Sequence, residues 1–425
     1  MKLGTEATAE AKPPGTFSLP AAPLRILHLN SMLKGGGTDD RSVRIAHALM
    51  QLGHATWMAG PAGREFVTTV EQLNIPFCPV PASGPLKLPL IVQTAKVVRR
   101  ERIQLLHARH GRDYWPAIMA ARLSGVRPKV VLSRHLAKSP GSWPSRRFLL
   151  SQCDALVAVS HFVAKVLREG DADPESDNPE RHYRAPIFGD YAKIHVLYGG
   201  FDMERFQPGD ASKQRQAWGL EPSHYAFAVV GGYDLPRGKG QREFLQAAAR
   251  IRKQCPNVRF LIVGRGNLQD ILKSDIAQLG LGDAARLTPY CLDMPAAMNA
   301  MDCLVLPQVG TEALPGVVCE AHACGKPVIA SNLDGIPEAF GVGNCGQLVT
   351  RGSVEELAAA MAAWAQKPGL EMPERRELHR RVAARFSLER AARDLAALYE
   401  LLLSPGARVS PETRNSMRAI ESNPR

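Results

Sequence analysis

The chain has 425 residues, of which 45% are hydrophobic and 22% charged, and it carries a formal net charge of +12. This composition is that of a globular protein, excludes a disordered chain, and leaves room for two or three domains. No apolar run approaches the about 18 residues of a membrane-spanning helix, and the first twenty residues contain no apolar segment typical of a secretory signal. The eight cysteines form no Cys-x-x-Cys pair, so we expect reduced thiols in a cytoplasmic protein.

Short strand patterns alternate with helical patterns along most of the chain. The strands predicted in the first half are 24–29, 54–59, 75–80, 103–107, 129–133, 155–159 and 194–197, with the first helix at 41–52. Those of the second half are 225–230, 259–263, 285–287, 303–306 and 327–330, with helices at 241–253, 268–279, 294–300, 316–324, 353–366, 373–385 and 387–403. This alternation predicts an α/β protein with two doubly wound parallel sheets and a ligand cleft at the carboxyl ends of their strands.

A glycine loop, Gly35-Gly36-Gly37, separates the first predicted strand from the first helix. Residues without a Cβ atom allow a ligand to approach the backbone, and the start of a helix favours an anion. The loop is not Gly-x-Gly-x-x-Gly, and the second strand ends without an acidic residue, which disfavours dinucleotide binding. A plain flexible turn is the alternative interpretation.

A second loop, 231–240, directly follows the first strand of the second half and contains Arg237 and Lys239. We expect both cations at the carboxyl end of that strand, facing the cleft. A guanidinium binds two phosphate oxygens and an ammonium adds a point charge, so the pair suits a diphosphate. A solvated basic loop is the alternative.

The segment 312–331 carries two carboxylates eight positions apart, Glu312 in a loop and Glu320 one turn inside a predicted helix. Gly316 and Glu320 share one helix face, so phosphate oxygens at the amides of Gly316 and Val317 and a hydroxyl pair at Glu320 would belong to one extended ligand. Glu312 would reach a different part of that ligand. Taken singly, each carboxylate is also explained as loop or surface charge, although a carboxylate in an otherwise apolar helix is unfavourable without a partner.

At this segment the sequence resembles the E-x7-E motif of the retaining glycosyltransferases of family four, which have the GT-B fold. Further stretches resemble other motifs of that family. Residues 132–135 resemble a strand end that presents a histidine, 158–160 a Val-Ser helix start, and 198–206 a linker. Residues 239–240 resemble a Lys-Gly element and 334–338 a GGxPE turn. Together these matches span about residues 24–400.

The resemblance implies transfer of a sugar from a nucleotide-diphosphate donor with retained anomeric configuration, and it implies no metal and no cofactor. Lys239 would hold the donor diphosphate, Glu320 its ribose, and Glu312 the hydroxyls of the transferred sugar. His135 would hydrogen-bond the donor sugar near the reacting centre. The loop Gly35–Gly37 would border the diphosphate and the acceptor.

The same resemblance implies a division of the chain into lobes. Residues 23–197 would form the acceptor domain, residues 198–386 the donor domain, and the helix 387–403 would return to the first domain. The ends, 1–22 and 404–425, lack apolar periodicity and are expected to be disordered tails.

The chain also departs from the family pattern. Asp234 stands at the offset where the family has an arginine, so either Arg237 replaces that arginine through a reshaped loop or diphosphate binding is weaker. Asp171-Ala172-Asp173 spells a metal-diphosphate motif of other glycosyltransferases, but it lies in a polar stretch without a preceding strand, and we assign no metal site to it.

Two basic regions leave alternatives open. His107, Arg109 and His110 follow a predicted strand and are expected either at the acceptor side of the cleft or, through the two histidines, at a metal, which the spacing disfavours. Residues 93–150 hold thirteen Lys and Arg against two acidic residues, interleaved with aromatic ones. Such a face suits an anionic membrane or a phosphorylated acceptor, or is simply solvated; without a nucleic-acid-binding motif we expect no nucleic-acid partner.

We therefore expect a cytoplasmic glycosyltransferase, peripheral to the inner face of the cell membrane, whose acceptor is a cell-envelope glycan or glycolipid of the lipopolysaccharide or exopolysaccharide type. One alternative is a GT-B phosphorylase or epimerase that acts without a separate acceptor. Another is a non-catalytic nucleotide-sugar-binding protein, which the unusual Asp234 keeps open.

Overall fold

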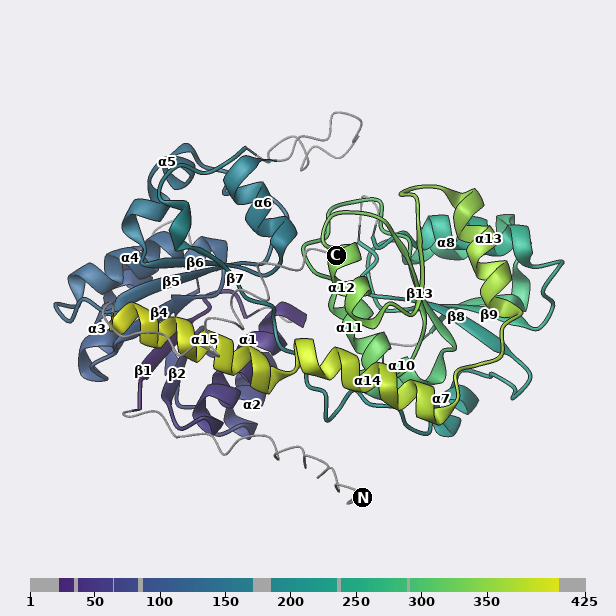
Figure 1. The fold of residues 1–425 in the computed structure, drawn as a ribbon, viewed down its shortest axis with the longest axis horizontal. Coiled ribbons are helices and arrows are strands. Elements are labelled where there is room, and N and C mark those ends of the chain that lie inside the picture. The colour runs from purple at the N-terminus through teal and green to yellow at the C-terminus, as the bar shows by residue number, and fades with distance from the viewer. Residues whose placement is uncertain are drawn as a thin grey trace, which may run out of the picture.

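The computed structural model describes residues 23–33, 37–63, 65–82, 87–170, 185–234, 238–288 and 291–404. Within these residues the strands form two sheets, and neighbouring strands run parallel in both. Figure 1 shows the sheets in two separate lobes, each flanked by helices. The predicted α/β class with two doubly wound sheets is thus confirmed.

The first sheet has the strand order β3-β2-β1-β4-β5-β6-β7. Its strands are β1 (Arg25–Leu29), β2 (Ala55–Gly60), β3 (Phe77–Pro79), β4 (Leu105–Ala108), β5 (Lys129–Arg134), β6 (Ala155–Ala158) and β7 (Ile194–Val196). Its helices are α1 (Gly37–Gln51), α2 (Glu65–Gln72), α3 (Leu88–Arg100), α4 (Tyr114–Leu123), α5 (Trp143–Gln152) and α6 (His161–Glu169).

The second sheet repeats this order as β10-β9-β8-β11-β12-β13. Its strands are β8 (Tyr225–Val230), β9 (Val258–Val263), β10 (Ala285–Thr288), β11 (Cys303–Leu306), β12 (Val328–Ser331) and β13 (Gly346–Val349). The helices of this half are α7 (Ser212–Ala217), α8 (Gln241–Ile251), α9 (Gln269–Gln278), α10 (Met294–Ala300), α11 (Gly316–Ala323), α12 (Ile336–Gly343), α13 (Val354–Ala365) and α14 (Met372–Phe386), followed by α15 (Leu388–Leu403).

Each sheet has a point at which the winding direction reverses, between β1 and β4 in one and between β8 and β11 in the other. All four residues of β4 and of β11 are buried, as expected for strands covered on both faces. At such a reversal the loops after the two strands diverge and leave a crevice at the carboxyl edge. The fold therefore places one ligand crevice on each lobe.

Two chain segments cross between the lobes side by side. The amide of Phe201 donates to the Phe386 carbonyl at 2.8 Å, and the amide of Leu388 donates to the Phe201 carbonyl at 3.1 Å. Beyond this crossing α15 lies across the first lobe, whereas α14 lies along the second (Figure 1). Leu395 and Tyr399 of α15 join Ile26 and Ile45 in one buried apolar cluster, so the end of the chain completes the core of the first lobe.

The structure differs locally from the sequence expectations. Helix α1 begins at Gly37 rather than near residue 41, and α7, α12 and β13 were not predicted. The segment expected to be a GGxPE turn begins α12: Asp334 has a positive φ of 52°, and Gly335 is the N-cap. The expected tails at 1–22 and 405–425 and the polar stretch 171–184 lie outside the described residues.

All eight cysteines are free thiols, as predicted, and five are buried. Within the part of the chain that the structure describes, no helix is both long enough and apolar enough to cross a bilayer.

Candidate functional site

A cavity of about 110 Å³ lies between the carboxyl edges of the two sheets. Its walls from the first lobe include Thr38 and Arg41 of α1 and His135, which follows β5. Glu312, which follows β11, forms part of the wall from the second lobe. The two crevices of the fold thus open into one space.

Lys239 and Glu312 meet at the reversal point of the second sheet. The ammonium Nζ lies 2.5 Å from the carboxylate Oε2, with the Lys239 side chain one-third exposed and the Glu312 side chain 14% exposed. The loop after β8 carries the cation and the loop after β11 carries the anion. A phosphate here would compete with Glu312 for the ammonium.

Glycines position both of these residues. Gly240, next to Lys239, has a φ of 85°, and a Cβ there would overlap the Pro307 carbonyl. A Cβ at Gly335 would overlap the Ala313 carbonyl, next to Glu312. The Gly335 amide donates to the Glu312 carbonyl at 3.1 Å, and the Glu312 amide donates to Asp334 at 3.1 Å. The start of α12 therefore fixes the backbone that presents Glu312.

Glu320 lies one turn into α11, beside a cation from the other lobe. A Cβ at Gly316 would overlap Arg41 Nη1 and would lie 3.5 Å from Glu320 Oε1. The Arg41 guanidinium carbon also lies 5.0 Å from the centre of the Phe201 ring. Burial raises the pKa of Glu320 to about 6, although Arg41 opposes this rise.

Arg41 was missed by the sequence analysis as a site residue. The available signal was its position in the helix that follows the glycine loop, where a side chain faces the same edge as the loop. The sequence does not show that Arg41 lies close to Gly316, because the two residues are far apart along the chain and meet only across the lobes.

His135 faces the cavity as a neutral imidazole. Burial, and then Arg109 and Arg41, hold its pKa well below the ordinary value. Its Nε2 is buried and has no hydrogen-bond partner among the described residues. This nitrogen is therefore available to a ligand hydroxyl.

A second space of about 300 Å³ adjoins the first on the side of the first lobe. The two share Thr38, Arg109, Ser133 and His135 in their walls. Arg109 is buried and donates from Nε to Ser42 Oγ at 3.2 Å. Neither Arg41 nor Arg109 forms an ion pair with a described carboxylate, although Arg41 lies close enough to Glu320 to lower the pKa of that carboxyl.

His107 does not lie at the acceptor side of the cleft. It is fully buried, with Nδ1 2.6 Å from the Tyr399 hydroxyl and Nε2 2.7 Å from Ser133 Oγ. His107 is therefore a core residue that joins β4 to α15, whereas His110 does line the second space. The described residues contain no group of three or more His, Cys, Asp or Glu suited to a metal ion.

The remaining predicted residues divide by location. Gly37 lines the second space, whereas Gly35, Gly36, Arg237 and Asp171–Asp173 lie outside the described residues. Gly316 and Val317 are half-buried at the start of α11. Asp234, where the family has an arginine, accepts a hydrogen bond from the Asn267 amide at 3.1 Å and ties its loop to the segment after β9.

The start of α6 in the first lobe is bonded directly to the second lobe. Ser160 Oγ accepts from the Val163 amide at 3.2 Å and donates to the Ala313 carbonyl at 2.7 Å. Glu338 accepts from the amides of His161 and Phe162 at 2.8 and 3.3 Å. These contacts hold the first lobe over the loop that carries Glu312.

Two lobes of this kind, with opposed carboxyl edges around a shared cleft, define the GT-B architecture. A glycosyltransferase of Rickettsia africae has the same fold, with a TM-score of 0.74 and 19% identity over 90% of this chain and 99% of that one. The Anabaena protein HepE, solved in complex with UDP and glucose, gives a TM-score of 0.69 and 22% identity over 89% of this chain and 99% of that one.

The similarity to glycosyltransferases is found in the sequence as well as in the fold. The model described as Glycosyltransferase Family 4 matches residues 35–175, and the model described as Glycosyl transferases group 1 matches residues 225–367. The chain therefore belongs to the glycosyltransferases of family 4 and group 1.

Curated relatives are also named as glycosyltransferases. The D-inositol 3-phosphate glycosyltransferase of Segniliparus rotundus is 33% identical over 266 residues, covering 59% of this chain and 58% of the relative. That of Kribbella flavida is 26% identical over 373 residues, covering 79% and 83%. With 37% and 50% of the Mycobacterium marinum and Rhodococcus jostii proteins matched, the chain spans about half the length of most of these relatives.

Proposed function

We propose that this protein transfers a sugar, with retained anomeric configuration, from a nucleotide-diphosphate donor on the second lobe to an acceptor held by the first. The observation that carries the proposal is the single cavity whose walls include Glu312 of one lobe and Arg41 and His135 of the other. A group bound there contacts a carboxylate, a guanidinium and a neutral imidazole at once.

The donor would occupy the carboxyl edge of the second sheet. Its diphosphate draws Lys239 away from Glu312, and the carboxylate freed in this way accepts hydrogen bonds from hydroxyls of the sugar. Glu320 accepts from the ribose, and the amides of Gly316 and Val317 face phosphate oxygens. When the bond between the anomeric carbon and the phosphate oxygen breaks, the electron pair stays on the diphosphate, where Lys239 stabilises it.

His135 would act from the opposite wall. Because its imidazole is neutral, it can donate to or accept from a sugar hydroxyl without adding a second positive charge at the anomeric carbon. We propose that no metal or cofactor takes part, since the ammonium of Lys239 supplies the charge that a metal would otherwise provide.

We propose an acceptor that carries a phosphate or another anionic group. Arg41 and Arg109 line the acceptor side without a carboxylate partner among the described residues. The curated relatives are named D-inositol 3-phosphate glycosyltransferases. An anionic group on a cell-envelope glycan or glycolipid would meet the same two guanidinium groups.

An exposed face around α5 supports a position at the cytoplasmic side of a membrane. Trp143 is 62% exposed and Phe188 is 56% exposed. Arg147 lies over the rings of Phe148 and Phe188, at 5.4 and 5.8 Å from their centres. Aromatic rings flanked by cations favour the interface of anionic lipids.

Membrane contact is tested by sedimentation with vesicles of phosphatidylglycerol or of phosphatidylcholine. We expect binding to the anionic vesicles only, and weaker binding after Trp143→Ser or Phe148→Ser. Leu292→Ser is the control, because Leu292 is 78% exposed on the other lobe. Equal losses in all three variants would contradict a specific membrane face.

Transfer is tested by a thermal-shift screen of nucleotide diphosphates and their sugars, followed by calorimetry and product analysis. Ligands that bind the folded state raise its stability with concentration, so the screen identifies the donor. Lys239→Ala and Glu320→Ala should each remove most donor affinity, and Glu312→Ala should lower turnover more than nucleotide binding. Unchanged donor affinity in the first two variants would refute their roles.

Product analysis separates the proposal from its alternatives. Sugar appearing on a phosphate-bearing acceptor, with retained configuration and in the presence of EDTA, would support it. A rearranged or phosphorolysed sugar would indicate an epimerase or phosphorylase. Donor binding without either transfer or slow hydrolysis would indicate a non-catalytic binding protein.

A further inference from the structure

A cavity of about 700 Å³ lies at the opposite end of the second sheet from the cleft. Tyr225 and Val258 begin β8 and β9, Lys326 lies shortly before β12, and all three line this cavity. Lys239 and Glu312, in contrast, follow the carboxyl ends of β8 and β11. The length of the strands therefore separates the two spaces.

Lys326 places an ammonium in this cavity without a counter-charge bonded to it. The residue is 8% exposed, and its side chain forms no hydrogen bond or ion pair with any residue that the structure describes. Burial, and then Arg375, lower its pKa to about 8, so it stays protonated at neutral pH. A buried cation without a partner is unfavourable, so binding of an anion next to it would be stabilising.

Arg375 of α14 adds a second cation with unused capacity. Its Nη2 donates to Asn299 Oδ1 at 2.6 Å and to the Cys324 carbonyl at 3.1 Å. Its Nε is buried and has no partner among the described residues. One N–H of this guanidinium is thus left for a ligand or a water molecule.

The carboxylates of the cavity wall are already engaged. Asp302 accepts from Arg215 at 3.1 Å and from the Ala226 amide at 2.7 Å. Asp210 accepts from the amide and the hydroxyl of Ser212 at 3.1 and 2.6 Å. Neither forms an ion pair with Lys326, and the wall holds three cations, Arg215, Lys326 and Arg375, against these two carboxylates.

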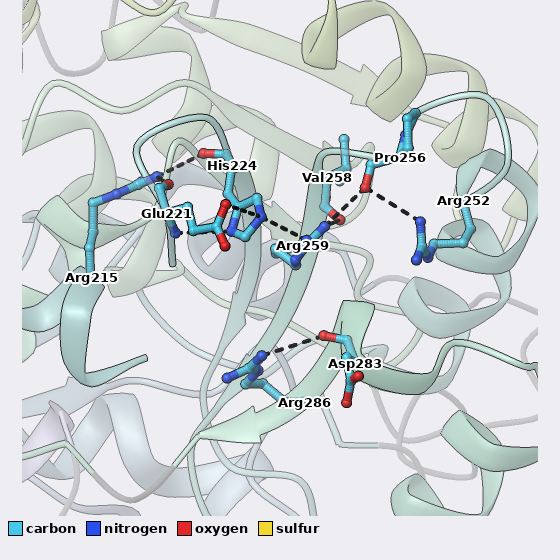
Figure 2. A network of polar contacts seen from close by, with 9 residues as sticks. All are labelled: Arg215, Glu221, His224, Arg252, Pro256, Val258, Arg259, Asp283 and Arg286. Atoms are coloured by element: carbon cyan, nitrogen blue, oxygen red, sulfur yellow. Dashed lines mark hydrogen bonds and ion pairs between the residues drawn. The ribbon is translucent and has the colours of Figure 1, made fainter. Parts of the chain in front are cut away.

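Further arginines belong to a polar network that includes the wall residues Arg215 and His224. Figure 2 shows Arg215 donating to the His224 carbonyl, Arg259 to the carbonyls of Pro256 and Val258, and Arg286 to that of Asp283. Carbonyl acceptors orient these guanidinium groups, and of the three only Arg215 also forms an ion pair with a described carboxylate, that of Asp302. The network therefore attracts anions toward the cavity.

We propose that this cavity binds a small phosphomonoester, with its phosphate between Lys326 and Arg375. A phosphate oxygen accepts from the Lys326 ammonium and from Arg375 Nε, so that each of these two donors gains a hydrogen-bond acceptor. The volume exceeds that of a phosphate ion and suits a phosphorylated sugar or a molecule of similar size. The site is independent of the proposed transfer reaction, because it shares no lining residue with the cleft.

The first test is calorimetry of glucose 6-phosphate and of inorganic phosphate with four proteins: wild type, Lys326→Met, Lys253→Met and Lys239→Ala. Met keeps the length of the side chain and removes its charge, and Lys253 is an exposed control on the same lobe. Lys326→Met should weaken glucose 6-phosphate binding at least tenfold and leave sugar transfer intact. Lys239→Ala should leave this binding intact and abolish transfer.

Two results would overturn the proposal: wild-type affinity in Lys326→Met, or complete loss of binding in Lys239→Ala, which would place the phosphate in the cleft. Binding of inorganic phosphate without glucose 6-phosphate would overturn the assignment to a phosphomonoester. Because transfer and phosphate binding are followed separately, failure of the proposed function leaves this test valid.

A second test uses the wild-type protein and does not depend on the folding of a variant. Lysines are labelled with acetic anhydride, with and without glucose 6-phosphate, and the sites are quantified by mass spectrometry. We expect glucose 6-phosphate to slow labelling of Lys326 several-fold and to leave Lys253 unaffected. Equal labelling of Lys326 in both conditions would overturn the proposal.

Discussion

The two ends of the second sheet each hold a lysine, but only one of the two lysines has a carboxylate partner among the described residues. At the carboxyl edge, the Lys239 ammonium lies 2.5 Å from the Glu312 carboxylate. Ser160 of the first lobe donates a hydrogen bond to the carbonyl of the next residue, Ala313. At the amino edge, the cavity opens away from the cleft, and Lys326 has no bonded counter-charge among the described residues.

The two lysines would therefore respond differently to an anion. Lys239 must exchange its carboxylate for a phosphate, and the exchange releases Glu312 for a second task. Lys326 gains a partner without losing one, so binding there changes charge balance but frees no catalytic group. The first arrangement suits a reaction and the second suits simple binding.

Removing the cation of the carboxyl edge should reduce activity more than any other change. Lys239→Ala should lower turnover by about 100-fold or more, because the leaving diphosphate loses its fixed positive charge. Lys326→Met should leave turnover unchanged. Initial rates with saturating acceptor measure both, and equal rates in wild type and Lys239→Ala would remove the distinction between the two ends.

A backbone change at the same edge should destabilise the protein. In Gly335→Ala the new Cβ overlaps the Ala313 carbonyl, so the loop of Glu312 must shift at a cost of about 3 kcal/mol. Gly341→Ala is a matched control in the same helix, because a Cβ there meets nothing within 4 Å and should stabilise the helix slightly. Denaturant unfolding of both variants checks this, and similar stabilities would show that Gly335 is not required.

Much of the carboxyl edge was predictable from the sequence, because its residues follow strands that the patterning identifies. The periodicity placed β8, β11 and α10 with their observed bounds, and the alternation of elements implied two parallel sheets. Glycines and charges directly after such strands must gather at one edge. This local logic is why Lys239 and Glu312 could be singled out.

Contacts between distant segments were not predictable in the same way. Arg41 meets Gly316, and Ser160 meets Ala313, only because the lobes close on each other. His107 shows the converse error: its neighbours in sequence suggested the cleft, but its side chain turns into the core toward Tyr399. The cavity at the amino edge was also missed, since Lys326 precedes its strand and looks like an ordinary loop lysine.

The pH dependence of stability gives a smaller and more specific test of the carboxyl edge. The folded-state pKa of Glu320, about 6, lies above the ordinary value of 4.5, so folding disfavours its ionised form. The resulting loss of folding stability is absent below about pH 4.5 and complete above about pH 6. Glu320→Gln should therefore be more stable than wild type by up to about 2 kcal/mol at pH 8 and equal to it at pH 4.

Chemical denaturation at both pH values measures this difference. Glu400→Gln on α15 is the control for the loss of a carboxylate that is exposed rather than buried. A Glu320→Gln variant that is less stable at pH 8 would mean that attraction to Arg41 outweighs burial.

A weaker effect is expected from the hydrogen bond by which the first lobe contacts the loop of Glu312. Ser160 and Ser142 both cap helices through their hydroxyl oxygens, at Val163 and Ser145, but only Ser160 also donates to the other lobe. Each alanine variant should lose about 1 kcal/mol of stability through its cap. Only Ser160→Ala should in addition weaken the hold on the Ala313 carbonyl and raise the KM for the donor. Glucose 6-phosphate binding at the amino edge should be the same in both variants, because neither serine lies near that cavity. If Ser142→Ala changes the donor KM as much as Ser160→Ala does, the effect is one of general stability, and the first lobe does not govern the carboxyl edge through this bond.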